Sequence, residues 1–317
     1  MEVRFRTFKK EKEKMKLLEN DLKRQLDRIF GKNIRYHEFL KFHTTFGIGG
    51  PADFYITPFE FKNLVEGIKL LKELHIPVMV LGSGSNVLVK DTGVKGSIFN
   101  MKNLADYIIK KDESIFAGAG TALSRLVNFA AEQNLSGLEW ASSIPGTVGG
   151  AVKGNAGAFG SCMGDLITGV DGLFPDGSSG IFEGKHIKFS YRSTDLPENL
   201  MILNTSFRLK KGKKEKILTL MKEYTDKRIQ SQPIERRSAG SVFKNPEKGF
   251  AGELIERAGL KGYSFKGARI SEKHANFIVN ENNASATDVL NLIDLIITTI
   301  FNMFNIRLEL EIKVLGE

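Results

Sequence analysis

The chain has 317 residues, of which 41% are apolar and 26% are charged, and it carries a formal net charge of +9. This is the composition of an ordinary globular protein, and the length exceeds the ~100–200 residues usual for one domain, so we expect two or three folded units. The single cysteine, Cys162, excludes an intrachain disulfide framework and a thiolate metal cluster built by one chain. We expect no metal site and a cytoplasmic location.

The positive charge is concentrated near the N-terminus. Residues 1–35 contain 12 Lys or Arg and 6 Asp or Glu, a net charge of +6 that leaves only +3 for the other 282 residues. Alternating signs along a helix favour a solvated face with i,i+4 ion pairs over an RNA-binding surface. We therefore expect no nucleic-acid partner.

No stretch of the sequence is typical of a targeting or membrane segment. The first 16 residues are charged throughout and lack the apolar core of a signal peptide. The longest apolar stretch, residues 289–304, is interrupted by Asn291, Asp294 and Asn302 and falls short of the ~20 residues of a membrane span. We expect no association with a membrane.

Hydrophobic periodicity predicts the first elements of the chain. Within residues 11–30, apolar side chains recur every three or four positions, which predicts an amphipathic helix. Alternation over residues 53–57 predicts a strand. The sequence Thr57-Pro58-Phe59-Glu60 is typical of a helix start, with Thr57 as the N-cap of a helix that runs to about His75.

The later elements mix strands and helices. They are short strands within 97–118, a helix over 123–133, strands and turns over 166–209, helices over 213–229, 251–258 and 287–304, a strand over 275–280 and a last strand near the C-terminus. Gly118-Ala119-Gly120 before the helix at 123 imitates a Rossmann opening, but Leu123 stands where a third glycine is required. Because strands and helices do not alternate strictly, the expected fold class is α+β.

Two glycine-rich loops are suited to close approach of the backbone to a ligand. The first is Gly82-Ser83-Gly84-Ser85-Asn86, and the second lies in residues 137–164, where 8 of 28 positions are glycine. Because glycine has no Cβ, such loops let N–H groups converge on an anion such as a diphosphate, and nearby hydroxyls add donors. The first loop connects two strand-like runs, which is not the context of a Rossmann or Walker loop.

Eight motifs together carry a family resemblance. They are T-F-G-I-G-G-P-A-D at 45–53, G-S-G-S-N-V-L-V at 82–89, G-L-E-W-A-S-S-I-P-G-T-V-G-G-A at 137–151, N-A-G-A-F-G at 155–160, Y-R-S-T at 191–194, A-G-S-V-F-K-N-P at 239–246, A-G-E-L-I-E-R-A-G-L-K-G at 251–262 and S-E-K-H-A-N-F-I-V-N at 271–280. In order and spacing, over roughly residues 40–317, the chain closely resembles the UDP-N-acetylenolpyruvoylglucosamine reductases, which act in bacterial cell-wall precursor synthesis.

The resemblance implies a fold and a cofactor. Residues 34–212 are expected to form a two-subdomain FAD-binding region of the vanillyl-alcohol-oxidase (PCMH-type) fold, split near residue 100, and residues 213–317 a C-terminal α+β substrate-binding domain. Residues 1–33 would be a basic helical extension. FAD would be bound non-covalently, NADPH would be the reductant, and we expect a monomer of the family's shorter type. The cofactor-binding residues implied by the loops and the resemblance are Gly82, Ser83, Gly84, Ser85, Asn86, Ser143, Gly146, Thr147, Gly149, Asn155, Ala156 and Gly157.

The resemblance also implies a reaction, the reduction of the enolpyruvyl ether of UDP-N-acetylglucosamine-enolpyruvate to UDP-N-acetylmuramate. Hydride from reduced FAD would reach the methylene carbon and leave enolate-like charge beside the substrate carboxylate. Arg192 matches the family's arginine that grips this carboxylate, and Ser241 matches its proton donor. Glu311 matches its catalytic glutamate, which helps to polarise the carboxylate.

Sequence pattern alone leaves the glutamate open. Alternation over residues 308–314 places Glu309, Glu311 and Lys313 on one face of a strand, where all three would face solvent. The family's C-terminal pattern favours Glu311, and Glu309 remains the alternative. The candidate substrate-binding residues are Tyr191, Lys244, Asn245 and His274.

Two other functions fit parts of the sequence. One is an oxidase of the same fold, although the absence of histidine between His75 and His186 disfavours the version with covalently attached flavin. The other is a non-enzymatic sugar-nucleotide or RNA-binding protein. Bound flavin would distinguish an enzyme from such a binder.

Overall fold

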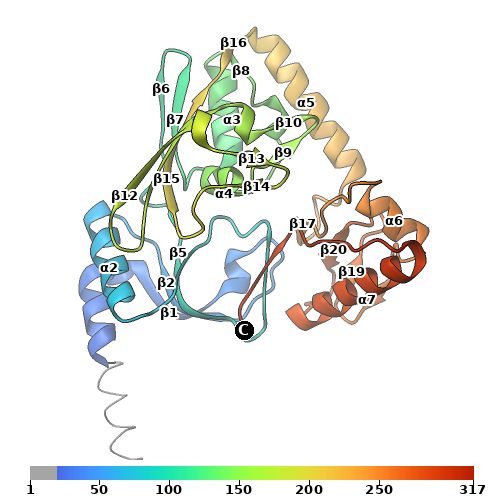
Figure 1. Ribbon diagram of the computed structural model, residues 1–317, viewed down its shortest axis with the longest axis horizontal. Helices are drawn as coiled ribbons and strands as arrows, with labels where there is room; N and C mark the ends of the chain where they lie inside the picture. Colours follow the sequence, from blue (N-terminus) through green and yellow to red (C-terminus); the bar gives the residue numbers. More distant parts are fainter. Residues whose placement is uncertain (1–19) are drawn as a thin grey trace, which may run out of the picture.

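The structure is a computed structural model that describes residues 20–317 of the chain. Three sheets of four or five strands follow one another in chain order, and the C-terminal end of the chain returns to the first unit (Figure 1). Helices cover these sheets, and strands and helices do not alternate regularly. The expected α+β class is therefore confirmed.

The first unit is a four-stranded sheet packed against helices. In sheet order its strands are β1 (Ile34–Phe39), β2 (Pro51–Ile56), β5 (Val94–Phe99) and β3 (Val78–Val80). β1 runs antiparallel to β2, whereas β2, β5 and β3 are parallel. Leu26 and Ile29, from a helix over residues 20–30, join α2 (Phe61–Glu73) in the core of this unit. The rest of the helix expected over residues 11–30 lies outside the described residues.

The start of α2 differs from the prediction. The helix begins at Phe61, after an uncapped Glu60, and not after Thr57. The N–H of Thr57 instead donates to the carbonyl of Asn33 at 2.8 Å. This bond ties Thr57, the residue after β2, to the end of η1, so the chain does not turn into a helix until Pro58 has been passed.

The second unit is a five-stranded antiparallel sheet. In sheet order its strands are β12 (Ser179–Glu183), β11 (Ile167–Leu173), β15 (Met201–Arg208), β7 (Ser114–Gly118) and β6 (Ile108–Lys111). The helices α3 (Leu123–Glu132) and α4 (Val148–Lys153) pack into the same hydrophobic core. α3 begins at the predicted residue because Ala122 and Gly146 anchor its first turn through backbone bonds.

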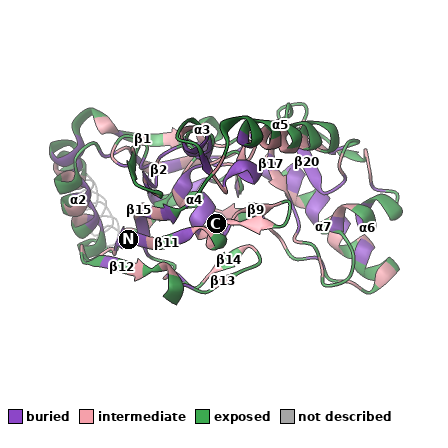
Figure 2. Cartoon of the chain, turned by 90° about the horizontal axis from the view of Figure 1, so that it is seen from above, coloured by how far each residue is buried: buried purple, intermediate pink, exposed green. Residues whose placement is uncertain are grey.

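The third unit is joined to the second by α5 (Lys214–Ser231). α5 runs along the surface from one unit to the other, and among its residues only Ile217 is fully buried (Figure 2). The third sheet contains, in order, β17 (Ser238–Ser241), β20 (Phe277–Asn280), β19 (Ala268–Ile270) and β18 (Ser264–Phe265). α6 (Ala251–Arg257) and α7 (Ala286–Phe304) lie against it.

α7 is a core helix that also meets a simple test for a membrane span. Within the described residues it alone is long and apolar enough to cross a membrane by length and composition. Its buried residues, such as Val289, Leu292 and Ile296, pack into the core of the third unit. A core helix passes the same test, so this finding is weak evidence for a membrane span.

The C-terminal strand is shorter than the sequence predicts. β21 (Lys313–Leu315) pairs in parallel with β4 (Val87–Val89) of the first unit, whereas Leu310 forms an isolated bridge with Phe243 of the third. Between these pairings the carbonyl of Val242 accepts from the N–H of Glu311 at 2.8 Å. The change of partner interrupts the strand at Glu311. The prediction that Glu309, Glu311 and Lys313 share one face is therefore wrong.

The remaining elements are short connections. They are η1 (Gly31–Asn33), η2 (Leu40–His43), β8 (Leu135–Ser136), η3 (Glu139–Ala141), β9 (Gly157–Ala158), β10 (Ser161–Cys162), η4 (Met163–Asp165), η5 (Gly184–His186), β13 (Phe189–Ser190), β14 (Ser193–Thr194) and β16 (Lys210–Lys211).

Candidate functional site

The two glycine-rich loops lie against each other although they are 60 residues apart. Ser85 Oγ donates to the carbonyl of Pro145 at 3.2 Å. A Cβ on Gly82 would lie 2.5 Å from Thr147 Oγ1, so only glycine leaves room for this approach. Gly84 and Gly146 have φ angles of +62° and +133°, which L side chains rarely adopt. The sequence therefore requires glycine at positions where the two loops meet.

Several hydrogen-bond donors of the loops have no partner within residues 20–317. None of the N–H groups of residues 82–85, nor those of Gly146 and Thr147, donates to another group of this part of the chain. Ser143 Oγ is buried there without a partner as well. Buried polar groups are normally hydrogen-bonded, so a partner is expected for these unpaired donors. An anionic cofactor such as FAD can be that partner, because glycine leaves the backbone N–H groups accessible to it.

Other predicted cofactor residues hold the protein together. A Cβ on Gly149 would lie 2.8 Å from that of Ala119, so the absence of a side chain at Gly149 lets α4 pack against the residue that follows β7. Asn155 donates to the carbonyl of Ser190 and accepts from the N–H of Gly164. The backbone of Ala156 is bonded on both sides, to Ala151 and Met163. For these three residues the structure shows structural contacts, and cofactor binding stays a prediction.

Asn86 and Gly157 connect the cofactor loops to the catalytic candidates. Asn86 Nδ2 donates to the carbonyl of Glu311 at 3.1 Å. The carbonyl of Gly157 accepts from Arg192 Nη1 at 2.9 Å. Ser83 is exposed beside these contacts. The two loops thus lie next to residues that come from much later in the chain.

Arg192 occupies the tip of the two-residue hairpin between β13 and β14. Its φ of +58° is unusual for a side chain larger than glycine. Its Nε lies 2.6 Å from Glu311 Oε1, and the two side chains are only 27% and 13% exposed. The Nε–H nevertheless has no aligned acceptor within residues 20–317. The contact is therefore an ion pair that occupies the Nε side of the guanidinium, and only Nη2, which makes no hydrogen bond within these residues, is left for a second anion.

Glu311, and not Glu309, faces the site. Glu309 is 75% exposed and pairs with Lys244, whereas Glu311 is enclosed beside Arg192. Burial raises the pKa of the Glu311 carboxyl group above its ordinary value of 4.5, although the charges of Arg192 and Lys244 act in the opposite direction. The geometry places Glu311, and not Glu309, beside Arg192, and the catalytic role of Glu311 stays a prediction.

Ser241 lies at the end of β17, between the first loop and Glu311. A Cβ on the preceding residue, Gly240, would be 4.0 Å from the carbonyl oxygen of Ser85. The following residue, Val242, accepts from the N–H of Glu311. Thr45, from the T-F-G-I-G-G motif, fastens this strand to the loop by bonding to Gly84 and Ser238. Arg192, Ser241 and Glu311 are thus brought to one region beside the loops.

The candidate substrate residues are placed unequally. Tyr191 is 56% exposed beside Arg192, and Lys244, which follows β17, bonds to Glu309 through both its N–H and its Nζ. Asn245 Oδ1 accepts from the N–H of Ala251 and so fixes the start of α6. His274 Nδ1 accepts from the N–H of Asn276. Tyr191 is free to reach a ligand, Lys244 would have to leave the exposed Glu309 to do so, and the bonded atoms of Asn245 and His274 serve the third unit.

Two basic residues near the site were missed in the sequence. Arg228 of α5 is close enough to Arg192 that burial and the Arg192 charge both lower the pKa of Arg228. Arg228 follows Tyr224 by four residues and so lies on the apolar side of α5. An arginine among these apolar residues is the sequence feature that could have indicated a role at the site. Lys153 donates to the carbonyls of Leu196 and Pro197 at 3.1 and 2.6 Å, which fastens α4 to the segment after the Arg192 hairpin.

We expect Glu311 to make stability depend on pH over a defined range. Its pKa is raised in the folded state, so its contribution to the free energy of unfolding is complete below the unfolded pKa and is lost as pH rises through the folded pKa. The free energy of unfolding of the natural chain, minus that of Glu311→Gln, should therefore fall as pH rises through this range. Urea unfolding at several pH values from about 4 to about 8 measures this difference. The exposed Glu309→Gln is the control, and a Glu311 difference that stays constant or rises with pH contradicts the expectation.

Comparisons with known proteins agree with this geometry. A family model described as "FAD binding domain" matches residues 52–179, which contain both loops. A second, described as "UDP-N-acetylenolpyruvoylglucosamine reductase, C-terminal domain", matches residues 232–315. Fold and site thus define an FAD-binding oxidoreductase with an α+β architecture.

Relatives and a solved structure identify the family. The UDP-N-acetylenolpyruvoylglucosamine reductase of Anoxybacillus flavithermus is 39% identical over 285 residues, covering 89% of this chain and 94% of the relative. That of Caldanaerobacter subterraneus is 42% identical over 282 residues, covering 89% and 93%. The crystal structure of the Thermus caldophilus reductase has a TM-score of 0.78 and 38% identity, covering 89% of this chain and all of that chain.

The chain belongs to the UDP-N-acetylenolpyruvoylglucosamine reductase family, the FAD-binding oxidoreductases of peptidoglycan precursor synthesis. The expected fold, a PCMH-type FAD-binding region followed by the C-terminal domain of this family, is confirmed. The length of 317 residues is consistent with the family's shorter type.

Proposed function

We propose that this enzyme reduces the enolpyruvyl ether of UDP-N-acetylglucosamine-enolpyruvate to UDP-N-acetylmuramate in the cytoplasm, with NADPH as the source of electrons. The observation that carries the proposal is the ion pair between Arg192 and Glu311, at 2.6 Å, beside the two glycine-rich loops. This pair joins a hairpin of the second unit to the segment after α7, and Ser241 lies next to it. Three kinds of group needed to manage developing negative charge are therefore gathered in one place.

The loops supply what a dinucleotide cofactor requires. The free N–H groups of residues 82–85, Gly146 and Thr147 would hold the diphosphate of FAD, and Ser143 Oγ would gain a partner from the same ligand. When bound, FAD would supply the hydride for the methylene carbon of the substrate and be restored by NADPH. No side chain is needed to attach the flavin covalently.

Arg192 would bind the carboxylate of the enolpyruvyl group. Its planar guanidinium suits a carboxylate, and its Nη2 makes no hydrogen bond within the described residues, whereas Nε lies against Glu311 and Nη1 donates to Gly157. The guanidinium is positioned in advance by Gly157 and Glu311. Because little rearrangement is then needed, its charge would stabilise the enolate-like state that follows hydride addition.

Ser241 would act on the carbon that carries the developing charge, and Glu311 would act on the carboxylate beside it. Ser241 would deliver a proton to the carbon that carries the developing charge, since it lies between the cofactor loop and Glu311. A serine hydroxyl is a weak acid, so this role depends on position and on nearby cations such as Lys244. Glu311, with its raised pKa, would orient Arg192 and help to polarise the substrate carboxylate.

The remaining candidates would contact the sugar nucleotide. Tyr191, and Lys244 on exchanging its exposed partner Glu309, would reach a phosphate or a sugar hydroxyl, while Asn245 and His274 would contribute from positions that also fix the third unit. We propose two domains, residues 34–212 and 213–317, of which the second pairs its β21 with β4 of the first. We also propose that the protein is a monomer. Residues 1–33 have no role in this proposal.

One spectroscopic experiment tests cofactor, reductant and substrate together. The purified protein should show the visible absorption bands of bound flavin. Under anaerobic conditions NADPH should bleach these bands, and UDP-N-acetylglucosamine-enolpyruvate should then restore them with formation of UDP-N-acetylmuramate. UDP-N-acetylglucosamine, which lacks the enolpyruvyl group, is the matched control and should not restore the flavin absorption bands. A protein that neither contains nor binds flavin would contradict the proposal and favour a non-enzymatic binding protein.

A further inference from the structure

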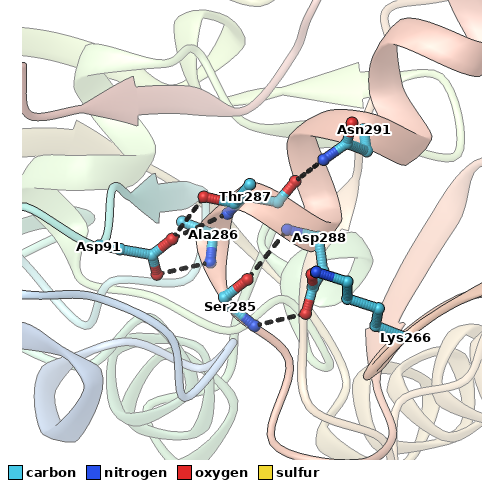
Figure 3. A network of polar contacts seen from close by, with 7 residues as sticks. All are labelled: Asp91, Lys266, Ser285, Ala286, Thr287, Asp288 and Asn291. Carbon is cyan, nitrogen blue, oxygen red and sulfur yellow. Dashed lines mark hydrogen bonds and ion pairs between the residues drawn. The ribbon is translucent and has the colours of Figure 1, made fainter.

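Asp91 of the first unit binds the start of helix α7, although the two are separated by about 195 positions in the chain. Its carboxylate accepts from the N–H of Ala286 at 2.8 Å, from the N–H of Thr287 at 3.0 Å and from the hydroxyl of Thr287 at 2.7 Å (Figure 3). These bonds outweigh the effect of burial and lower the pKa of the Asp91 carboxyl group. Asp91 therefore remains an anion at the positive end of the helix dipole.

α7 does not require Asp91 in order to begin at this position. Ser285 and Asp288 form a reciprocal capping box, in which Ser285 Oγ accepts from the N–H of Asp288 and Asp288 Oδ2 accepts from the N–H of Ser285 (Figure 3). Residues along the whole helix are also buried in the third unit. The contribution of Asp91 is thus to the placement of the helix relative to the first unit.

The residues around Asp91 make this placement relevant to the site. Asp91 follows β4, which directly continues the first glycine-rich loop. β4 pairs with β21, Lys90 N–H donates to the carbonyl of Leu315, and Asn86 holds the backbone of Glu311. The segment 86–91 therefore binds the start of α7 at one end and the residue Glu311 at the other.

Helix and glutamate belong to one continuous stretch of chain. α7 ends at Phe304, and only the segment 305–310 separates it from Glu311. Both ends of the stretch from Ala286 to Glu311 are consequently attached to the same short segment of the first unit. If the attachment at α7 is released, the position of Glu311 relative to the loops depends on the other links, which are β21, Asn86, the bonds of Thr45 and the packing of Phe46, Ile48 and Leu88 into the core of the third unit.

We propose that Asp91 is a positioning residue that docks α7 onto the first unit and so holds the third unit, with Ser241 and Glu311, at the cofactor loops and opposite Arg192. This inference rests on the proposed function for its effect on catalysis, but the docking itself can be measured without turnover. Asp91 touches neither substrate nor cofactor in this role. It acts through the position of the third unit.

Pulsed electron spin resonance on the FAD-containing protein tests the docking. Cys162 is the only cysteine, so a Cys162→Ser background allows spin labels at the exposed positions Lys62→Cys on α2 and Glu253→Cys on α6. Asp91→Ala should broaden the distribution of distances between the labels. It should also accelerate hydrogen exchange at the N–H groups of Ala286 and Thr287. Asp112→Asn, which removes a charge from an exposed turn, is the control and should change neither.

Turnover of the same variants tests the consequence for catalysis. In Asp91→Ala, kcat/KM for the enolpyruvyl substrate should fall by about tenfold, the scale of a lost helix cap, while the flavin content stays unchanged. Asp91→Glu should restore part of this loss, because its carboxylate can still accept from the first turn of α7. Asp91→Asn and Thr287→Ala each remove part of the contact and give the same test should Asp91→Ala not fold.

The outcomes separate the two proposals. An unchanged distance distribution in Asp91→Ala, or a broadened one with unchanged kcat/KM, would overturn the role of Asp91. An inactive natural chain would instead contradict the proposed function, while the spin-label distances would still report whether Asp91 docks the third unit.

Discussion

Replacing Ser241 by Ala is expected to slow the reoxidation of bound flavin by UDP-N-acetylglucosamine-enolpyruvate by about 10²–10⁴-fold, the range typical of general acid catalysis. Reduction of the flavin by NADPH should remain nearly unchanged, because that step requires no proton from Ser241. The two half-reactions are measured separately by anaerobic stopped-flow absorption. A split between them would identify Ser241 as the proton donor.

A second serine on the same strand provides the control for Ser241. Ser238 lies three residues earlier on β17, and its carbonyl, not its hydroxyl, holds Thr45. Ser238→Ala should therefore leave both half-reactions close to those of the natural enzyme. Equal damage to both half-reactions in Ser241→Ala would show that Ser241 supports the structure of β17 and does not act in catalysis.

Replacing Arg192 by Ala is expected to lower kcat for the enolpyruvyl substrate by about 10²–10³-fold, the effect of removing one donor that stabilises developing negative charge. The change also leaves Glu311 enclosed without its cation. The pKa of Glu311 should then rise further, so the pH dependence of the residual activity should shift upward. Steady-state kinetics from about pH 5 to about pH 9 measures both effects.

The lysine variant separates charge from shape at position 192. Arg192→Lys retains the positive charge but loses the planar pair of donors, so it should recover only a part of the lost activity. Arg208→Ala, at the exposed end of β15, is the matched control and should change neither kcat nor its pH dependence. Full activity in Arg192→Ala would exclude the proposed role in binding the carboxylate.

Local patterns predicted those elements whose signals lie within a few residues. The capping box of Ser285 and Asp288 and the apolar stripe behind it are sufficient to place α7, which begins at Ala286, one residue from the predicted start. The glycines of the two loops likewise indicated backbone conformations that other residues avoid, as the positive φ angles of Gly84 and Gly146 show. Signals of this kind are local because the atoms that satisfy them are neighbours in the chain.

Patterns failed where a distant partner determines the local structure. Thr57 has the chemistry of an N-cap, but its N–H is bonded to Asn33 directly after β2, so the helix begins later. Arg228 occupies an apolar stripe of α5 because the chain brings Arg192 and the site against it. Neither partner could be identified from the spacing of nearby residues, since each comes from a different element.

The amino-acid sequence by itself indicated the fold class and the two loops through periodicity and glycine content, and the candidate residues Arg192, Ser241 and Glu311 through the resemblance of its motifs to a known family. Only the tertiary structure decided that Glu311, rather than Glu309, faces the site. At that point the chain changes its pairing partner from Phe243 to β4, and the alternation of a continuous strand no longer applies. The attachment of α7 to Asp91 was decided in the same way, because a carboxylate and a helix start that are far apart in sequence meet only after the chain has folded.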